Sequence, residues 1–101
     1  MAEKLKITAQ RPDGSTFNVK GQEAHTLALL VEKGAAGVTA FDFRGGPAFR
    51  LAAYCFTLKR HHHAVIETVR EPHEGGWHGR FVLHTPLEIV WRSDWPQRAA
   101  A

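Results

Sequence analysis

Residues 47–61, with the sequence PAFRLAAYCFTLKRH, are the stretch that decides the fold. Pro47 suits the first turn of a helix, because the N–H that proline lacks has no partner there, and Gly45 and Gly46 break whatever comes before. Apolar residues then recur at helical spacing, namely Ala48, Leu51, Ala52, Cys55 and Leu58. The opposite side carries Arg50, Tyr54, Thr57 and His61. We therefore expect an amphipathic helix that packs one face and exposes the other.

Three further side chains of this helix carry expectations. Phe49 and Phe56 flank the polar side, and we expect both to pack against the rest of the protein. Cys55 lies on the apolar stripe, which favours a small core residue over a nucleophile. As the single cysteine of the chain it excludes an internal disulfide, so a reducing compartment, the cytoplasm, is expected.

Two shorter helices are expected before this one. Residues 21–33 have apolar residues at helical spacing, and Gly34 stands where a left-handed cap ends a helix. From Thr39 to Asp42 the sequence has the pattern of a capping box, in which a hydroxyl begins the helix and a carboxylate three residues later reaches back to it. The pattern predicts a short second helix.

Strand patterns flank the helical core, which we place at 21–62. Residues 4–19 alternate apolar and polar side chains around a Pro-Asp-Gly turn, which predicts an N-terminal hairpin. Residues 65–70 and 80–84 are β-prone and are separated by a long glycine-rich tip, which predicts a second hairpin over 64–85. Residues 85–91 favour a further strand or an apolar flap beside that hairpin. Residues 93–101 are polar and alanine-rich, and we expect them to be disordered.

The order of elements predicts an α+β fold in one domain, residues 1–92. Three helices are followed by a C-terminal β-hairpin, and the short connection between the second and third helices is typical of a helix-turn-helix. In that arrangement the third helix is the recognition helix and the hairpin is a wing beside it. A chain of 101 residues that is 44% hydrophobic supports one core of this size.

A family resemblance rests on five segments of the sequence. They are GVTAFD (37–42), FRLAAY (49–54), LKR (58–60), VIET (65–68) and GWHGRFVL (76–83). Together they resemble the small bacterial and prophage winged helix-turn-helix proteins over residues 24–85. The resemblance implies a DNA-binding fold. This sequence departs from the family pattern at two places. The family usually has an aliphatic and then a polar residue at the positions of Cys55-Phe56, and a glycine or similar turn residue at the position of His61–His63. Histidine tolerates the left-handed conformation that such a turn needs.

The distribution of charge points to a nucleic-acid partner. The formal net charge is only +3, and residues 1–43 hold five basic and five acidic side chains. From Arg44 to Arg60, however, there are four basic residues and no acidic ones. Such a local positive patch is typical of a phosphate-binding face, although a solvated helix face would give the same pattern.

The sequence therefore predicts a surface that binds double-stranded DNA. On the recognition helix we expect contacts from Arg50, Tyr54, Thr57, Lys59, Arg60 and His61, with Arg50 suited to the two acceptors of a guanine. Arg44 is placed for the DNA backbone. In the wing we expect contacts from Arg70, His73, Trp77, His78 and Arg80. Trp77 has an alternative, in which it folds back over the sheet and closes the core.

Other functions were weighed on the same residues. A protein-interaction module would use the wing or Trp91 and Trp95, and RNA binding would use Tyr54 and Trp77 with nearby basic residues. The histidines lack the thiolates or the i, i+4 pair of a zinc site, and no catalytic constellation or cofactor motif is evident. We therefore expect that the protein is not an enzyme, binds no metal or cofactor and has no membrane segment. We expect instead a bacterial or prophage regulator of transcription or recombination that is associated with the nucleoid. The DNA target and the oligomeric state stay open.

Overall fold

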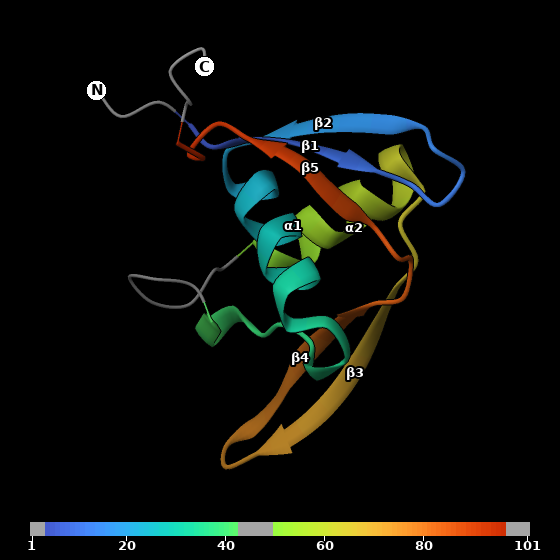
Figure 1. Ribbon diagram of the computed structural model, residues 1–101. Helices are drawn as coiled ribbons and strands as arrows, with labels where there is room; N and C mark the ends of the chain where they lie inside the picture. The colour runs from blue at the N-terminus through green and yellow to red at the C-terminus, as the bar shows by residue number, and fades with distance from the viewer. Residues whose placement is uncertain (1–3, 43–49, 97–101) are drawn as a thin grey trace, which may run out of the picture.

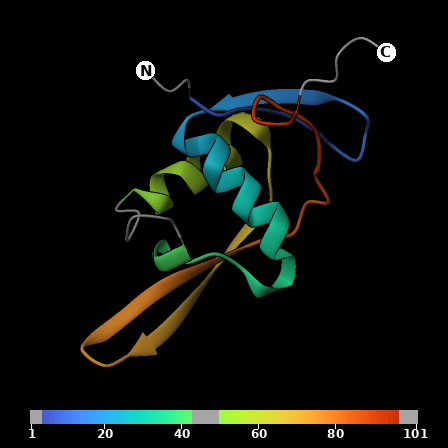
Figure 2. The ribbon, with the colours of Figure 1, turned by 60° about the vertical axis from the view of Figure 1, so that its left-hand side comes forward.

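The computed structural model describes residues 4–42 and 50–96 (Figure 1). Its strands are β1 (Lys6–Gln10), β2 (Thr16–Lys20), β3 (Ile66–His73), β4 (Gly76–Leu83) and β5 (Glu88–Arg92). Its α-helices are α1 (Gln22–Lys33) and α2 (Leu51–His62), and 3₁₀ turns occupy Gly34–Ala36 and Ala40–Asp42. The helices lie between a three-stranded sheet and the β3–β4 hairpin, which projects from the body of the protein in both views (Figure 1, Figure 2). The predicted α+β class is confirmed.

The three-stranded sheet has the antiparallel order β2-β1-β5 and contains the predicted N-terminal hairpin. Ile7 pairs with Val19 and Ala9 with Phe17, and all four side chains are buried on one face. Strand β5 pairs with the other edge of β1. This corrects our expectation that the last apolar segment lies beside the wing. The reason is burial, because Ile89 lies opposite Ala9 and packs against the core from there.

Ser93 fastens the end of β5 to the start of β1. Its N–H donates to the carbonyl oxygen of Lys6 at 2.8 Å, and its hydroxyl oxygen accepts from the N–H of Lys6 at 2.8 Å. Arg92 donates two hydrogen bonds of 2.9 Å to the carboxylate of Asp94. Ordered structure thus extends past residue 92, where we expected disorder to begin. Residues 97–101 of that segment lie outside the described residues.

Over the described residues, the second helix that we expected from Thr39 is a single 3₁₀ turn. Its capping pair is present, because the Asp42 carboxylate accepts a hydrogen bond from the Thr39 N–H at 2.8 Å. The turn buries none of its three residues, however, and Phe41 is 66% exposed. A helix this short is stable only when one face packs. The described residues therefore contain two α-helices instead of the predicted three.

Helix α2 buries three residues of the predicted apolar stripe but leaves Ala52 exposed, and Ala48 lies outside the described residues. Leu51, Cys55 and Leu58 are at most 3% exposed. His63 caps the C-terminal end of the helix: its φ of 60° lies in the left-handed region, and its N–H donates to the Leu58 carbonyl oxygen. The interpretation that a histidine takes the place of a turn glycine is confirmed. The predicted start of the helix, residues 47–49 with Phe49, lies outside the described residues.

Phe56 does not pack as we expected, because 58% of it is exposed. Each residue of an α-helix is turned about 100° from its neighbour. Since Cys55 points into the core, Phe56 is carried round to the flank of the helix. There the guanidinium carbon of Arg60 lies 6.0 Å from the centroid of its ring.

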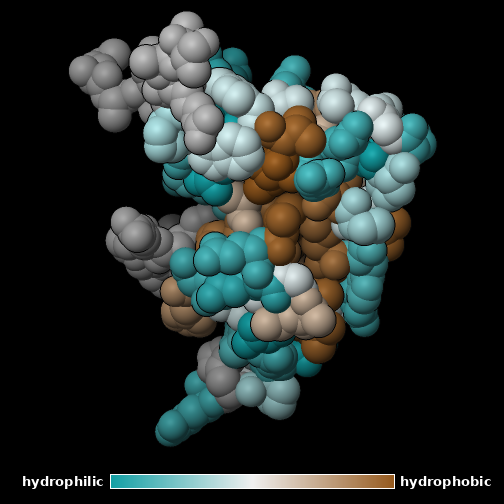
Figure 3. Space-filling model, in the orientation of Figure 1, coloured by the Kyte–Doolittle hydropathy of each residue, from teal (hydrophilic) through white to brown (hydrophobic). Residues whose placement is uncertain are grey.

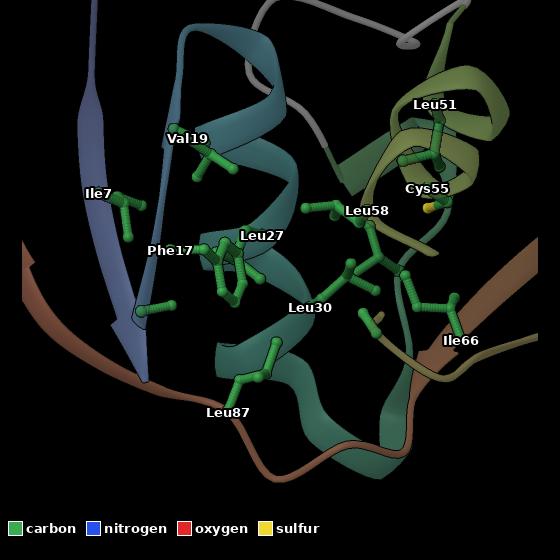
Figure 4. Packing of buried hydrophobic residues seen from close by; sticks show 14 of the residues in the cluster. Ile7, Phe17, Val19, Leu27, Leu30, Leu51, Cys55, Leu58, Ile66 and Leu87 are labelled. Atoms are coloured by element: carbon green, nitrogen blue, oxygen red, sulfur yellow. The ribbon is translucent and has the colours of Figure 1, made fainter. Parts of the chain in front are cut away.

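The core joins the sheet, both helices and the base of the hairpin. Figure 4 shows Ile7, Phe17 and Val19 of the sheet directed towards α1, with Leu58 and Ile66 on the far side of that helix. Within this cluster Leu27, Leu30 and Leu58 are completely buried. The fold therefore rests on α1, which is covered by the sheet, by α2 and by the base of the hairpin.

Truncation of the core and of the flank of α2 should differ sharply. We expect Leu58→Ala to lower the free energy of unfolding by about 2–5 kcal/mol, because it leaves a cavity in the core. Phe56→Ala removes a larger but exposed side chain and should cost less than about 1 kcal/mol. Urea denaturation of the two variants measures both values. An equal loss would mean that Phe56 packs after all.

His62, at the end of α2, joins the helix to the N-terminal sheet. Its ring stacks on Phe17 with centroids 4.5 Å apart, and its backbone carbonyl accepts a hydrogen bond from Nε of Arg11 at 3.1 Å. The carboxylate of Glu23 lies 3.5 Å from the imidazole. Burial lowers the pKa of His62 from its usual value, although Glu23 opposes this shift.

A depressed pKa makes the stability contributed by His62 depend on pH. The unfolded chain, whose histidines titrate near about 6.5, binds more protons than the folded one as the pH falls below that value. Stability should therefore fall as the pH decreases from about 7 towards the lower folded-state pKa. His62→Phe keeps a ring on Phe17 but cannot take up a proton, so its loss between these pH values should be smaller. Urea denaturation at neutral pH and at a pH below about 6 measures the stability of both proteins. If both lose the same stability between the two pH values, His62 does not cause the loss.

Candidate nucleic-acid interface

The strand register gives the two faces of the β3–β4 hairpin different chemistry. Residues directly opposite each other in an antiparallel pair project to the same face. The face that contains the buried Ile66 also carries Thr68, Arg70 and Trp77. The other face carries Glu67, Glu71, His78 and Arg80. Both carboxylates of the two strands thus lie on the face turned away from the core.

The carboxylates on the outer face of the hairpin are paired with side chains of the protein itself. The carboxylate of Glu71 lies 2.8 Å from Nε of Arg80 and 2.9 Å from Nε2 of His78. The hydrogen bond from Arg80 is the main cause of a lowered pKa of Glu71. Arg80 also donates to the carbonyl oxygen of Ala36 at 3.0 Å, and Glu67 pairs with His84 at 2.8 Å. His78 and Arg80, predicted to contact DNA, are therefore engaged within the protein.

One flank of α2 is turned towards the N-terminal sheet. Tyr54 and Thr57 are half-buried and border hollows that they share with residues of β2 and of the start of α1. The hydroxyl of Thr57 donates to the carbonyl oxygen of Ala53 at 3.1 Å. Arg50, just before the helix, and His61 are exposed. Of the predicted polar stripe, the middle is therefore partly covered and the two ends are open.

The opposite flank of α2 is turned towards the hairpin. It carries Ala52, Phe56 and Lys59, which are all exposed, and Arg60 is exposed next to it. Helix α2 contains neither aspartate nor glutamate. Lys59 and Arg60, both predicted to contact DNA, therefore lie on a helix surface without negative charge.

A hollow of about 420 Å³ separates this flank from the hairpin. Phe56 and Lys59 border it from the helix, and Thr68 and Trp77 border it from the hairpin. Cys55 also contributes to its lining, although only 1% of this residue is exposed. Burial raises the pKa of the Cys55 thiol to about 12, so the thiol stays protonated at neutral pH. The interpretation of Cys55 as a small core residue is confirmed.

Trp77 and Arg70 form a stacked pair near the end of the hairpin. The guanidinium carbon of Arg70 lies 4.1 Å from the centroid of the Trp77 ring, and Trp77 is 54% exposed. The alternative in which Trp77 closes the core is therefore wrong. The physical reason is its position in the register, because Ile66 and Phe81, nearer the base of the hairpin, already cover the core there.

Two predicted contacts cannot be placed, and three exposed residues of the hollow were missed. Arg44 lies outside the described residues, as does the side chain of His73. Ala52, Phe56 and Thr68 border the hollow, but the sequence analysis did not predict that they belong to a binding site. A signal was present for the first two, because residues 52, 56 and 59 recur at helical spacing. Thr68 and Arg70 are two positions apart along β3, so both project to the same face of the hairpin.

Within residues 4–42 and 50–96, no group of three or more His, Cys, Asp or Glu side chains is arranged to hold a metal ion. No helix within these ranges has both the length and the apolar character needed to cross a bilayer.

Two packed α-helices, with a projecting two-stranded hairpin on one side and a small antiparallel sheet on the other, are an arrangement of the winged-helix class. The chain belongs to the winged helix domain family, whose model matches residues 16–93. The predicted winged-helix family is thereby confirmed, although the match says nothing of a bacterial or prophage origin. It extends beyond the resemblance at both ends to include β2 and β5. Neither the curated proteins nor the solved structures yield a match to this chain.

The wing is anchored to the body of the domain by a bridge between Val38 and Phe81. Their backbones exchange hydrogen bonds of 2.8 and 2.9 Å. The preceding Gly37 has a φ of 76°, and a Cβ atom there would lie 2.7 Å from Cγ of Arg80 and 3.0 Å from the Phe81 carbonyl oxygen. Only glycine fits this approach to β4 without displacing the wing.

Alanine at two glycines should separate backbone strain from this close approach. Gly14 has a φ of 90° but open space around it, so Gly14→Ala should cost about 1 kcal/mol of stability. Gly37→Ala adds the collision with β4 and should cost about 2–4 kcal/mol. Thermal or urea denaturation measures the difference. Equal costs would show that the wing accommodates a side chain at residue 37.

Proposed function

We propose that this chain binds double-stranded DNA through α2 and the wing, without catalysing a reaction. The observation that carries the proposal is the separation of charge described above. The hollow between α2 and the wing, which we call the helix–wing hollow, is bordered by Lys59, while Arg60 and Arg70 lie against its lining residues Phe56 and Trp77. None of these three cations takes part in the described ion pairs. The carboxylates of the wing strands are held on its other face. We call Lys59, Arg60 and Arg70 the basic surface.

The shape of α2 supports insertion into a major groove. The groove of B-form DNA admits one α-helix, and the exposed Ala52 and Ala53 have short side chains that allow a close approach. Arg50 stands at the N-terminal end of the helix, from which recognition helices contact base edges. Lys59 and Arg60 lie near the other end and suit phosphates. Arg70 in the wing would then lie over the neighbouring backbone or minor groove.

A protein that combines a base-reading arginine with phosphate contacts is suited to regulate transcription or recombination, which are the roles that we expected from the sequence. The protonated, buried thiol of Cys55 is unsuited to nucleophilic chemistry. This supports a binding protein more than an enzyme.

The salt dependence of binding tests the basic surface. We expect the affinity for a short duplex to fall steeply with salt, because bound phosphates release counterions. Lys59→Ala, Arg60→Ala and Arg70→Ala should each reduce the slope of log K against log salt by about 0.9. Lys33→Ala removes the same charge from the exposed C-terminal end of α1, outside the basic surface, and should leave the slope unchanged. Fluorescence anisotropy over a salt series supplies these slopes, and equal slopes in all four variants would refute the assignment.

A protein-interaction module is the second candidate, and exposed apolar side chains on another surface favour it. Val90, Trp91 and Trp95 are each at least 40% exposed, on or just after β5. Figure 3 shows apolar surface gathered over α1 and β5, in the middle of this side of the molecule. A duplex affinity that does not change with salt would favour this candidate over DNA binding.

A further inference from the structure

The helix–wing hollow has features that binding to a paired duplex does not use. Phe56 and Trp77 border it from opposite sides, and more than half of each residue is exposed. Two large rings left open to water lose the stabilisation that burial would give them. Aromatic faces beside a cationic groove are the platforms on which proteins stack unpaired bases.

We propose that this hollow receives one unstacked nucleobase from DNA that lies on the basic surface. The inference rests on the proposed function and names the form of DNA that the same surface prefers. At about 420 Å³ the hollow falls within the range of about 300–1,000 Å³ that is usual for pockets that hold organic ligands. Its floor is apolar where Leu51 and Cys55 line it, which suits the flat face of a base.

The charges around the hollow fit a nucleotide better than a neutral ligand. Lys59 stands on its helix side, and Arg70 is held against Trp77 on its wing side. Cations at both borders can hold the phosphates that precede and follow the base. The carboxylates of Asp42 and Glu71 belong to segments that border the hollow, and both accept internal hydrogen bonds, from Thr39 and from Arg80. They therefore repel phosphate less than open carboxylates would.

The energetics select for bases that are already unpaired. Extrusion of a base from an intact duplex costs a few kcal/mol of stacking and pairing, and the cost is least for a mismatched or bulged base. Stacking on an aromatic side chain returns about 1–3 kcal/mol. The hollow is therefore expected to receive a bulged nucleotide readily and a paired one rarely.

The test compares two DNAs that differ by one nucleotide. One is a short paired duplex, and the other carries a single bulged 2-aminopurine, whose fluorescence falls when it stacks on an aromatic ring. We expect the bulged duplex to bind about tenfold more tightly, with quenching of the 2-aminopurine. Trp77→Leu and Phe56→Leu should bring the ratio of the two affinities close to one. Trp91→Leu, which removes an exposed tryptophan from the other sheet, should preserve both the ratio and the quenching.

The outcomes separate this inference from the function on which it rests. Equal, salt-dependent affinities for both DNAs without quenching would overturn the base-binding hollow and leave duplex binding standing. A preference that survives both Trp77→Leu and Phe56→Leu would place the unpaired base elsewhere and would also overturn it. Failure to bind either DNA would refute the proposed function itself. Circular dichroism of each variant confirms that a lost preference does not reflect unfolding.

Discussion

The burial of one side of α2 determines what the rest of the domain presents to solvent. Leu58 is completely buried, and Cys55 almost so, and together they fix the rotation of the helix about its axis. Once that rotation is fixed, Tyr54 must lie on the flank near the N-terminal sheet and Lys59 on the flank near the wing. The surface chemistry of the helix thus follows from apolar contacts that no ligand touches.

Much of the fold could be predicted because its local signals agree with its tertiary contacts. The capping pair at Thr39, the turn at His63 and the wing hairpin all follow from short-range rules that the structure satisfies. The failures concern contacts between distant segments. Helical spacing divides α2 into an apolar and a polar side, but it cannot show that the sheet of β1, β2 and β5 covers part of the polar side. Likewise nothing near Phe56 in the sequence shows that the wing leaves it uncovered.

The wing shows how the period of two in a strand separates one cation, Arg70, from the carboxylates of the same strand. In a helix, residues that differ by one or two positions point in several directions, whereas in a strand they alternate strictly between two faces. Glu67 and Glu71 therefore share one face with Arg80, while Arg70 is left on the other face beside Trp77. The net charge of the chain hides this arrangement, because it adds together groups that a bound polyanion would meet separately.

The pairing of β1 with β5 has a consequence for how the chain acquires its structure during synthesis. Thr8 pairs with Trp91 in the antiparallel register of β1 and β5. One edge of the middle strand therefore has no partner until nearly the whole domain has left the ribosome. The hairpin of β1 and β2 and the two helices can associate earlier, since their contacts are closer in sequence. During that interval the open edge of β1 is a surface on which nascent chains could pair wrongly, and arrival of the last strand ends this exposure.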